Sequence, residues 1–178
     1  MRKLQFLILI AMFPAAVCTA DEGVLRLEGF TIDSTGLQVK SKEPQTTAYG
    51  TLAAFLYLPP TQGFAPNVNV LIQDVPNPIQ EYADLSKQQF KSANLTVLND
   101  HLVGDGEWAC EYSGNMQGKD LHFYARALKK GDKVYLVTAT AALDQWDSVF
   151  PKLKSCVDSF AFTQPDSTGN PKEAPASH

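Results

Sequence analysis

The chain has 178 residues, of which 44% are hydrophobic and 19% are charged, and its formal net charge at pH 7 is −4. This length and composition predict one globular domain with tails, and they exclude a fibrous repeat or wholesale disorder. The acidic balance also argues against nucleic acid as a partner, because nucleic-acid binding favours concentrated basic patches.

The first twenty residues have the pattern of a secretory signal peptide. Arg2 and Lys3 precede an almost wholly apolar run over residues 4–13, and mostly small residues fill 15–20. The run is short for a membrane span, so we predict cleavage after Ala20 rather than a retained anchor. The protein is therefore expected to be exported, in the first place to a bacterial periplasm, with secretion from the cell as the alternative.

Removal of this peptide changes the charge and leaves one further alternative. Arg2 and Lys3 are lost but no acid is, so the net charge changes from −4 to −6. Cys18 keeps a lipoprotein signal open as a less favoured alternative, because Val17 stands where such signals usually have a small residue. No later segment holds about 18 consecutive apolar residues, so we predict no membrane span in the mature chain.

The mature chain divides into three parts by composition. Residues 21–47 form a polar lead-in, with short strands expected around 29–33 and 36–40. The folded domain is expected over residues 48–162. Residues 163–178 are rich in proline, serine, glycine and charge, which predicts a disordered tail.

The first half of the domain is predicted to contain two strands and a helix. Residues 51–58 are apolar and rich in β-formers, as in a strand covered on both faces. Residues 67–73 alternate apolar with polar side chains, which predicts a half-buried strand. Residues 79–92 combine helix formers with a polar face, and their apolar members are Ile79, Tyr82, Ala83, Leu85 and Phe90.

A four-strand region follows. A short strand is predicted over residues 96–101, and three further strands over 107–113, 121–128 and 133–141. The intervening segments, one of them residues 114–118, are rich in turn residues. The three longer strands, joined by short turns, predict an antiparallel meander.

The last predicted element is an amphipathic helix. Its apolar residues recur at intervals of three and four: Trp146, Val149, Phe150, Leu153, Val157 and Phe160. Asp144 is the expected N-cap. Pro151 conflicts with a regular helix, so either the helix begins nearer Ser148, with the proline in its first turn, or it is kinked.

After cleavage two cysteines remain, Cys110 and Cys156. Cys110 shares a strand face with Trp108 and Tyr112, and Cys156 lies three residues after Leu153 on the apolar helix face. If the helix packs on that strand face the two thiols can meet, so we predict one disulfide, with two buried free thiols as the alternative. Their spacing rules out a catalytic CxxC pair.

The order of elements and the end of the domain resemble PsbP-like and DcrB-like domains. The resemblance is carried by residues 133–141 (KVYLVTATA), 144–146 (DQW) and 157–160 (VDSF), and it covers about residues 48–162. It implies an α/β (α+β) sandwich, with a central, mostly antiparallel sheet and helices packed on its faces. It also implies a noncatalytic accessory or binding protein of a kind that bacteria commonly export. The manganese-related role of the photosynthetic members is not transferred, because no metal-binding motif maps onto this chain.

No motif in the sequence names a reaction, so no catalytic residue, cofactor or metal ligand is assigned. HExxH, G-x-S-x-G and G-x-G-x-x-G patterns are all absent. His101, Asp105 and Glu107 could imitate a metal cluster, but they span a predicted turn, so turn polarity is the preferred interpretation.

The best candidate for binding is an alternating set on one predicted strand, His122, Tyr124 and Arg126. If their sheet face is open, they could form a ligand or partner platform, because aromatic residues and arginine are enriched in interfaces. The alternative is that a helix covers this face and the residues are structural.

These observations predict an exported, noncatalytic accessory protein that binds another protein or a component of the cell envelope. Two alternatives stay open. One is a small-ligand carrier with a pocket between sheet and helices. The other is a small hydrolase or metal-dependent enzyme that uses His101 or His122.

Overall fold

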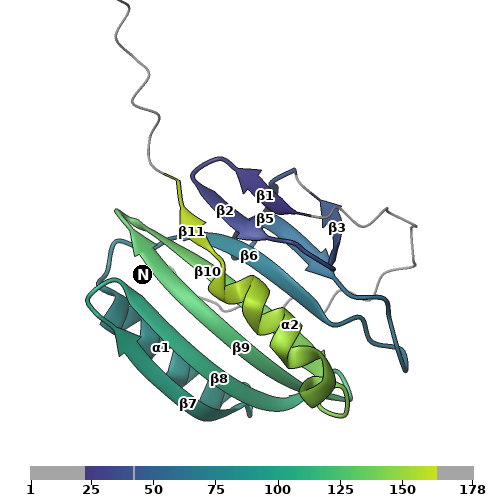
Figure 1. Cartoon of the computed structure of the whole chain (residues 1–178). Helices are drawn as coiled ribbons and strands as arrows, with labels where there is room; N and C mark the ends of the chain where they lie inside the picture. Colours follow the sequence, from purple (N-terminus) through teal and green to yellow (C-terminus); the bar gives the residue numbers. More distant parts are fainter. Residues whose placement is uncertain (1–22, 42, 164–178) are drawn as a thin grey trace, which may run out of the picture.

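The computed structural model describes residues 23–41 and 43–163 (Figure 1). The predicted signal peptide, and the predicted tail apart from Thr163, lie outside the described residues. Among the helices of the described residues, none is long and apolar enough to cross a membrane.

One large antiparallel sheet forms the centre of the described chain. Its strands follow the order β3-β5-β6-β10-β9-β8-β7, and β4 pairs with β5 beside this path. The bounds are β3 Gln38–Ser41, β4 Gln45–Thr47, β5 Gly50–Tyr57, β6 Asn67–Asp74, β7 Thr96–Val103, β8 Glu107–Met116, β9 Lys119–Lys130 and β10 Lys133–Ala142. The predicted three-strand meander is confirmed as β8–β10, and β7 adds a further antiparallel strand beside β8.

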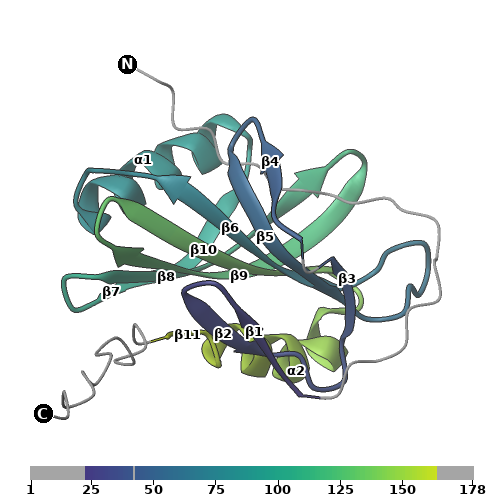
Figure 2. The same cartoon turned by 90° about the horizontal axis from the view of Figure 1, so that it is seen from above.

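Two helices and a small second sheet cover the two faces. Helix α1 (Ile79–Ser92) lies on one face, and helix α2 (Trp146–Asp158) lies on the other (Figure 2). Beside α2 lies a three-stranded sheet of β1 (Val24–Leu27), β2 (Phe30–Asp33) and β11 (Ala161–Phe162), in the order β1-β2-β11. The predicted fold class, an α+β sandwich around a mostly antiparallel sheet, is confirmed.

The sheet separates two hydrophobic cores. The α1-side core lies between the sheet and α1, and its largest side chains are Trp108, Tyr82, Tyr112, Phe90 and Phe123. The α2-side core lies under α2 and the small sheet, and it includes Phe30, Ile32, Leu37, Leu56, Leu153 and Phe160. Strands β2 and β3 lie in the two segments where short strands were expected. Apolar residues between positions 25 and 39 belong to the α2-side core. The boundary at residue 48 stays a prediction.

Helix α1 agrees with its predicted bounds, and its ends have clear physical causes. Pro78 precedes it, where the missing N–H of a proline does no harm. At its end Asn94 has a positive φ of 57°, and the N–H of Leu95 donates to the carbonyl of Phe90 at 2.8 Å. This backbone hydrogen bond closes the last turn of the helix, which therefore ends before β7.

Strand β8 continues to Met116, into the segment 114–118 that was predicted as a turn. Gly114 lies inside the strand, where an added Cβ would be 2.6 Å from Leu95 Cδ2, so the glycine allows Leu95 to pack against the backbone. The turn itself has only two residues, Gln117 and Gly118, with φ of 53° and 80°. Two consecutive positive φ angles match the tight hairpin turn that suits twisted antiparallel strands.

Strand β6 corrects the expectation of a half-buried strand. Its polar residues Asn67, Asn69 and Gln73 are 3%, 8% and 3% exposed, so both faces are buried. The amide of Gln73 accepts a hydrogen bond from Tyr82 in α1 at 2.6 Å and donates one to the carbonyl of Tyr49 at 3.0 Å. Because β6 lies inside the sheet between β5 and β10, its polar side chains are enclosed by protein; that of Gln73 is hydrogen-bonded there, whereas Asn67 Oδ1 is buried without a partner among the described residues.

The start of α2 differs from the alternative of a start near Ser148, whereas a kink at Pro151 stays a prediction. The helix begins at Trp146, so Pro151 lies inside it and not in its first turn. The predicted cap Asp144 is wrong, because Gln145 holds the N-cap position. The side chain of Gln145 does not cap the helix; it donates to the carbonyl of Thr61, 2.6 Å away, which ties α2 to the loop after β5.

Candidate functional site

The predicted platform on β9 is covered by helix α2. The indole ring of Trp146 stacks on the imidazole of His122, with 4.0 Å between the centroids. The ring of Phe150 meets Tyr124 edge-on at 5.8 Å. The structure therefore brings His122, Tyr124 and Arg126 to one face, as predicted, but places a helix against that face rather than open solvent. A role of the three residues in binding stays a prediction.

Arg126 joins three elements through one guanidinium group. Its Nε and Nη2 donate to the two carboxylate oxygens of Glu107 at 2.6 and 3.0 Å, and its Nη1 donates to the carbonyl of Asp158 at 3.0 Å. These hydrogen bonds to Glu107 raise the pKa of Arg126. The cation also lies at the C-terminus of α2, where the helix dipole favours positive charge. Arg126 therefore ties β8 and β9 to the end of α2.

Tyr124 is held at the same end of α2. Its hydroxyl donates to Asp158 Oδ1 at 2.9 Å, and Lys154, which forms an ion pair with Asp158, lies 5.1 Å from the centre of the tyrosine ring. Burial raises the pKa of Tyr124, and the hydrogen bond to Asp158 raises it further. The hydroxyl therefore remains protonated at neutral pH and serves as a donor.

His122 is the most buried of the three and has a carboxylate beside it. His122 Nε2 and Glu111 Oε1 are 2.7 Å apart, and the histidine is 9% exposed. Its other ring nitrogen, Nδ1, has no hydrogen-bond partner within residues 23–41 and 43–163. The alternative of an enzyme that uses His122 would need a histidine beside a carboxylate, and Glu111 provides one. The His122 ring, however, is stacked against Trp146.

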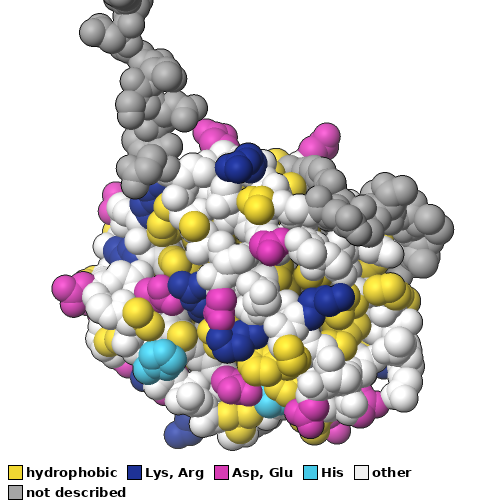
Figure 3. All heavy atoms as spheres, viewed as in Figure 1, with side chains coloured by type: hydrophobic (Ala, Val, Ile, Leu, Met, Phe, Trp, Pro, Cys, Tyr) yellow, Lys and Arg dark blue, Asp and Glu magenta, His cyan; other side chains and the backbone are white. Residues whose placement is uncertain are grey.

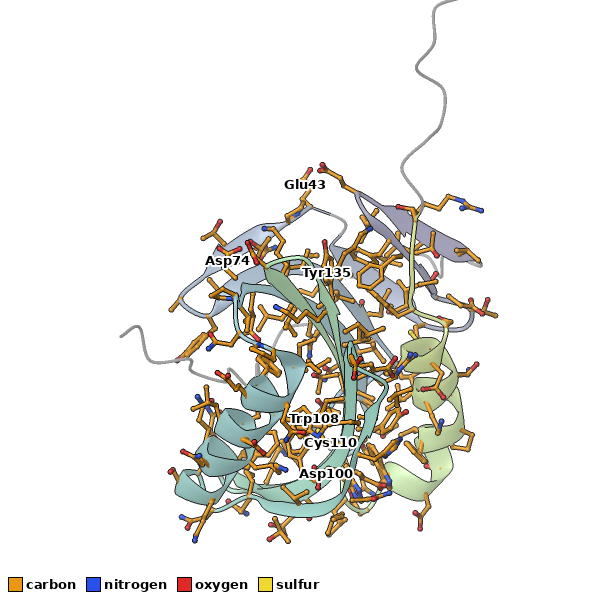
Figure 4. The ribbon with its side chains drawn as sticks, turned by 90° about the vertical axis from the view of Figure 1, so that its left-hand side faces the viewer. Glu43, Asp74, Asp100, Trp108, Cys110 and Tyr135 are labelled. Atoms are coloured by element: carbon orange, nitrogen blue, oxygen red, sulfur yellow. The ribbon has the colours of Figure 1, made fainter. Side chains whose placement is uncertain are left out.

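The predicted disulfide between Cys110 and Cys156 is wrong. Cys110 belongs to the α1-side core and Cys156 to the α2-side core, and both are free and buried. Figure 4 shows α1 and α2 on opposite sides of the sheet, with Cys110 labelled. The prediction required α2 to pack on the strand face that carries Cys110, whereas it packs on the other. Burial raises the pKa of both thiols, to about 12 for Cys156.

We expect the folded protein to carry two unreactive thiols. Without denaturant, Cys110 and Cys156 should react with Ellman's reagent at pH 7.5 at least tenfold more slowly than after unfolding, because both are buried and protonated. Reductant should leave the melting temperature unchanged. A melting temperature that falls in dithiothreitol, or an unfolded chain that shows no free thiol, would contradict the assignment.

The residues that could imitate a metal cluster in the sequence do not form a metal site in the structure. His101 is exposed on β7, and the carboxylate of Glu107 is engaged by Arg126. Within residues 23–41 and 43–163, no group of three histidine, cysteine, aspartate or glutamate residues is placed to hold a metal ion. Figure 3, which views the face that carries α2, shows acidic, basic and apolar side chains intermingled rather than a patch of one charge.

Strand β7 is an open edge of the main sheet that sequence reasoning missed. It stands at the end of the strand order and pairs with β8 (Figure 1). Three of its apolar side chains are exposed: Leu98 at 52%, Leu102 at 42% and Val103 at 48%. The predicted strand ended at residue 101 and so excluded two of them. Two apolar residues directly after His101 were the signal that the strand continues.

Comparisons with known proteins identify the fold. A scan against protein-family models found no match, and a search of curated proteins found none. The structure is similar to cyanobacterial PsbP (CyanoP) from Synechocystis, with a TM-score of 0.59 and 14% identity, over 84% of this chain and 98% of that chain. It is also similar to a protein of unknown function from Pseudomonas aeruginosa, with a TM-score of 0.54 and 10% identity, over 69% and 97% of the two chains. LpqN of Mycobacterium tuberculosis, involved in cell envelope biogenesis, matches with a TM-score of 0.49 and 13% identity, over 83% and 89%.

Proposed function

We propose that this chain, which has the PsbP-like fold, is an exported accessory protein that binds another protein and catalyses no reaction. The observation that carries the proposal is the open, apolar edge at β7. Export rests on the signal-peptide pattern of residues 1–20. A non-enzymatic role is consistent with the structural similarity to PsbP.

The β7 edge has the features of a site for strand addition. The strand has eight residues and contains no proline, and Asp100 is its only acidic residue. Natural sheets usually protect an edge by short length, proline or charge. The opposite end of the sheet follows this rule by length, because β3 has only four residues; the pairing of each edge strand with its neighbour contains one register shift.

The occupant we propose is an extended segment of a partner protein with apolar side chains at alternate positions. Such a segment would pair with the free backbone groups of β7, and its row of apolar side chains would contact exposed apolar residues on one face of that strand, such as Leu102; Val103, the next residue, points to the opposite face. A second copy of this chain fits less well. In an antiparallel pairing that places Leu98 opposite Leu102 of the second copy, Asp100 of one chain lies opposite Asp100 of the other. Two like charges directly opposite each other are destabilising.

The proposal is tested by site-specific photo-crosslinking in the source cells. A photoreactive amino acid at Val103 should give one discrete adduct with a partner protein, whereas the same group at Leu143, which is 54% exposed beyond β10, should not. Replacing Leu98 and Leu102 with lysine should lower the adduct yield at least tenfold, because the ammonium groups would be desolvated in the contact. The matched control Leu143→Lys should leave it unchanged.

The cross-linked peptide identifies the mode of binding. Mass spectrometry should place the link in an extended partner segment with alternating apolar residues. An adduct of twice the mass of this chain would assign the edge to self-association and overturn the proposal. Equal adducts from positions 103 and 143, or no adduct from 103, would overturn it as well.

A further inference from the structure

We infer that a pocket between α2 and the turn after β2 binds a small zwitterion of the free amino acid class. The pocket has a volume of about 270 Å³ and is lined by Asp33, Thr35, Lys152, Ser155 and Cys156. It lies beside the small sheet and does not involve β7, so this inference is independent of the proposed protein contact.

The pocket holds two opposite charges that do not neutralise each other. Asp33 and Lys152 both line it, yet within residues 23–41 and 43–163 no ion pair joins them and Lys152 has no other acidic partner. Hydrogen bonds from the side chain and backbone of Thr35 lower the pKa of Asp33, so the carboxylate is charged at neutral pH. One anionic and one cationic group therefore face the same small space.

The Asp33 side of the pocket is held in place before any ligand binds, whereas Thr35, Lys152 and Ser155 are exposed. The hydroxyl of Ser159 accepts the backbone N–H of Asp33 at 2.8 Å and donates to the carbonyl of Cys156 at 2.6 Å, which ties the β2 end to α2. The N–H of Thr35 donates to Asp33 Oδ1 at 2.8 Å and fixes the carboxylate. Lys152 packs over Gly36, where an added Cβ would be 2.8 Å from its Nζ.

This arrangement selects a ligand that carries both charges. An ammonium group would pair with Asp33 and a carboxylate with Lys152, while the hydroxyls of Thr35 and Ser155 offer hydrogen bonds. A simple anion would meet the Asp33 carboxylate, and a simple cation would meet Lys152, so each is repelled by one wall. Cys156 adds no charge, because burial raises the pKa of its thiol to about 12. The volume suits a molecule smaller than a drug-sized ligand.

The test is a chemical-shift titration of the purified mature protein with each common amino acid, and with acetate and methylammonium as single-charge controls. At least one amino acid should give saturable shifts at residues 33–36 and 152–156. Acetate and methylammonium should bind at least tenfold more weakly. If no amino acid gives saturable shifts there, or if acetate gives the same shifts at the same concentration, the inference is wrong.

Three variants separate binding from folding. Asp33→Asn keeps an oxygen for the Thr35 N–H, so the turn should fold, and Lys152→Met keeps the length of an exposed side chain. Each should weaken amino acid binding at least tenfold with spectra that remain those of the folded protein. The matched control Lys133→Met removes a surface lysine paired with Asp74 and should leave binding unchanged. Unchanged binding in Asp33→Asn and Lys152→Met would overturn the inference.

Discussion

Replacing Trp108 with alanine is expected to lower the free energy of unfolding by about 4 kcal/mol. Trp108 is 1% exposed in the α1-side core, with its ring centroid 6.4 Å from those of Tyr82 and Phe90. Its Nε1 also donates to Asp100 Oδ2 at 3.1 Å. The substitution removes the largest side chain between α1 and β8, and the surrounding rings cannot close such a cavity. The melting temperature should fall by roughly 8–16 °C.

Two controls separate packing from hydrogen bonding at Trp108. Trp108→Phe keeps an aromatic ring but loses the donor to Asp100, and it should cost about 1.5 kcal/mol. Leu102→Ala changes the exposed neighbour that pairs with Trp108 across β7 and β8, and it should cost less than about 0.5 kcal/mol. Denaturant unfolding measures all three variants. A loss below about 1 kcal/mol for Trp108→Ala would show that α1 does not depend on this side chain.

Replacing Arg126 with methionine is expected to lower the free energy of unfolding by about 3 kcal/mol. The side chains of Arg126 and Glu107 are 16% and 17% exposed, so water screens the pair only weakly. Without the guanidinium, the Glu107 carboxylate has lost its cation and the last carbonyls of α2 have lost a donor. Docking of the C-terminal end of α2 should weaken most.

A double-mutant cycle tests this account of Arg126. Adding Glu107→Gln to Arg126→Met should recover about 1 kcal/mol or more, because the double variant no longer leaves a mostly buried charge without a partner. Lys154→Met provides the matched control. It breaks an exposed pair with Asp158, whose side chains are 44% and 39% exposed, and it should cost less than about 1 kcal/mol. Additive effects of the two substitutions in the cycle would contradict a direct ion pair.

Local patterns were sufficient to predict the meander and the two helices. The meander and the two helices follow from alternation, turn residues and helical periodicity, which act over a few residues. The bounds of β8 were less predictable, since Gly114 was interpreted as a turn residue although it lies in a strand against Leu95. Whether a glycine permits a turn or a close packing contact depends on a neighbour from another element.

The candidate sites were less predictable than the elements. Alternation placed His122, Tyr124 and Arg126 on one face, and the structure agrees. It could not show that α2 lies on that face, so the three residues contact the helix instead of open solvent. The zwitterion pocket joins Asp33 to Lys152, more than a hundred residues apart, and no local motif links them.

The sequence by itself determined the class of this protein: the antiparallel meander, the two amphipathic helices and the resemblance to PsbP-like domains. Only the tertiary structure decided which sheet face each helix covers. That choice keeps the two cysteines in separate cores and places α2 over the predicted platform. The physical reason is that an amphipathic helix can bury its apolar stripe equally well on either face of a sheet whose two sides are both apolar. The choice depends on long-range contacts, such as those of Arg126 and Ser159 with distant residues, which a local pattern does not contain.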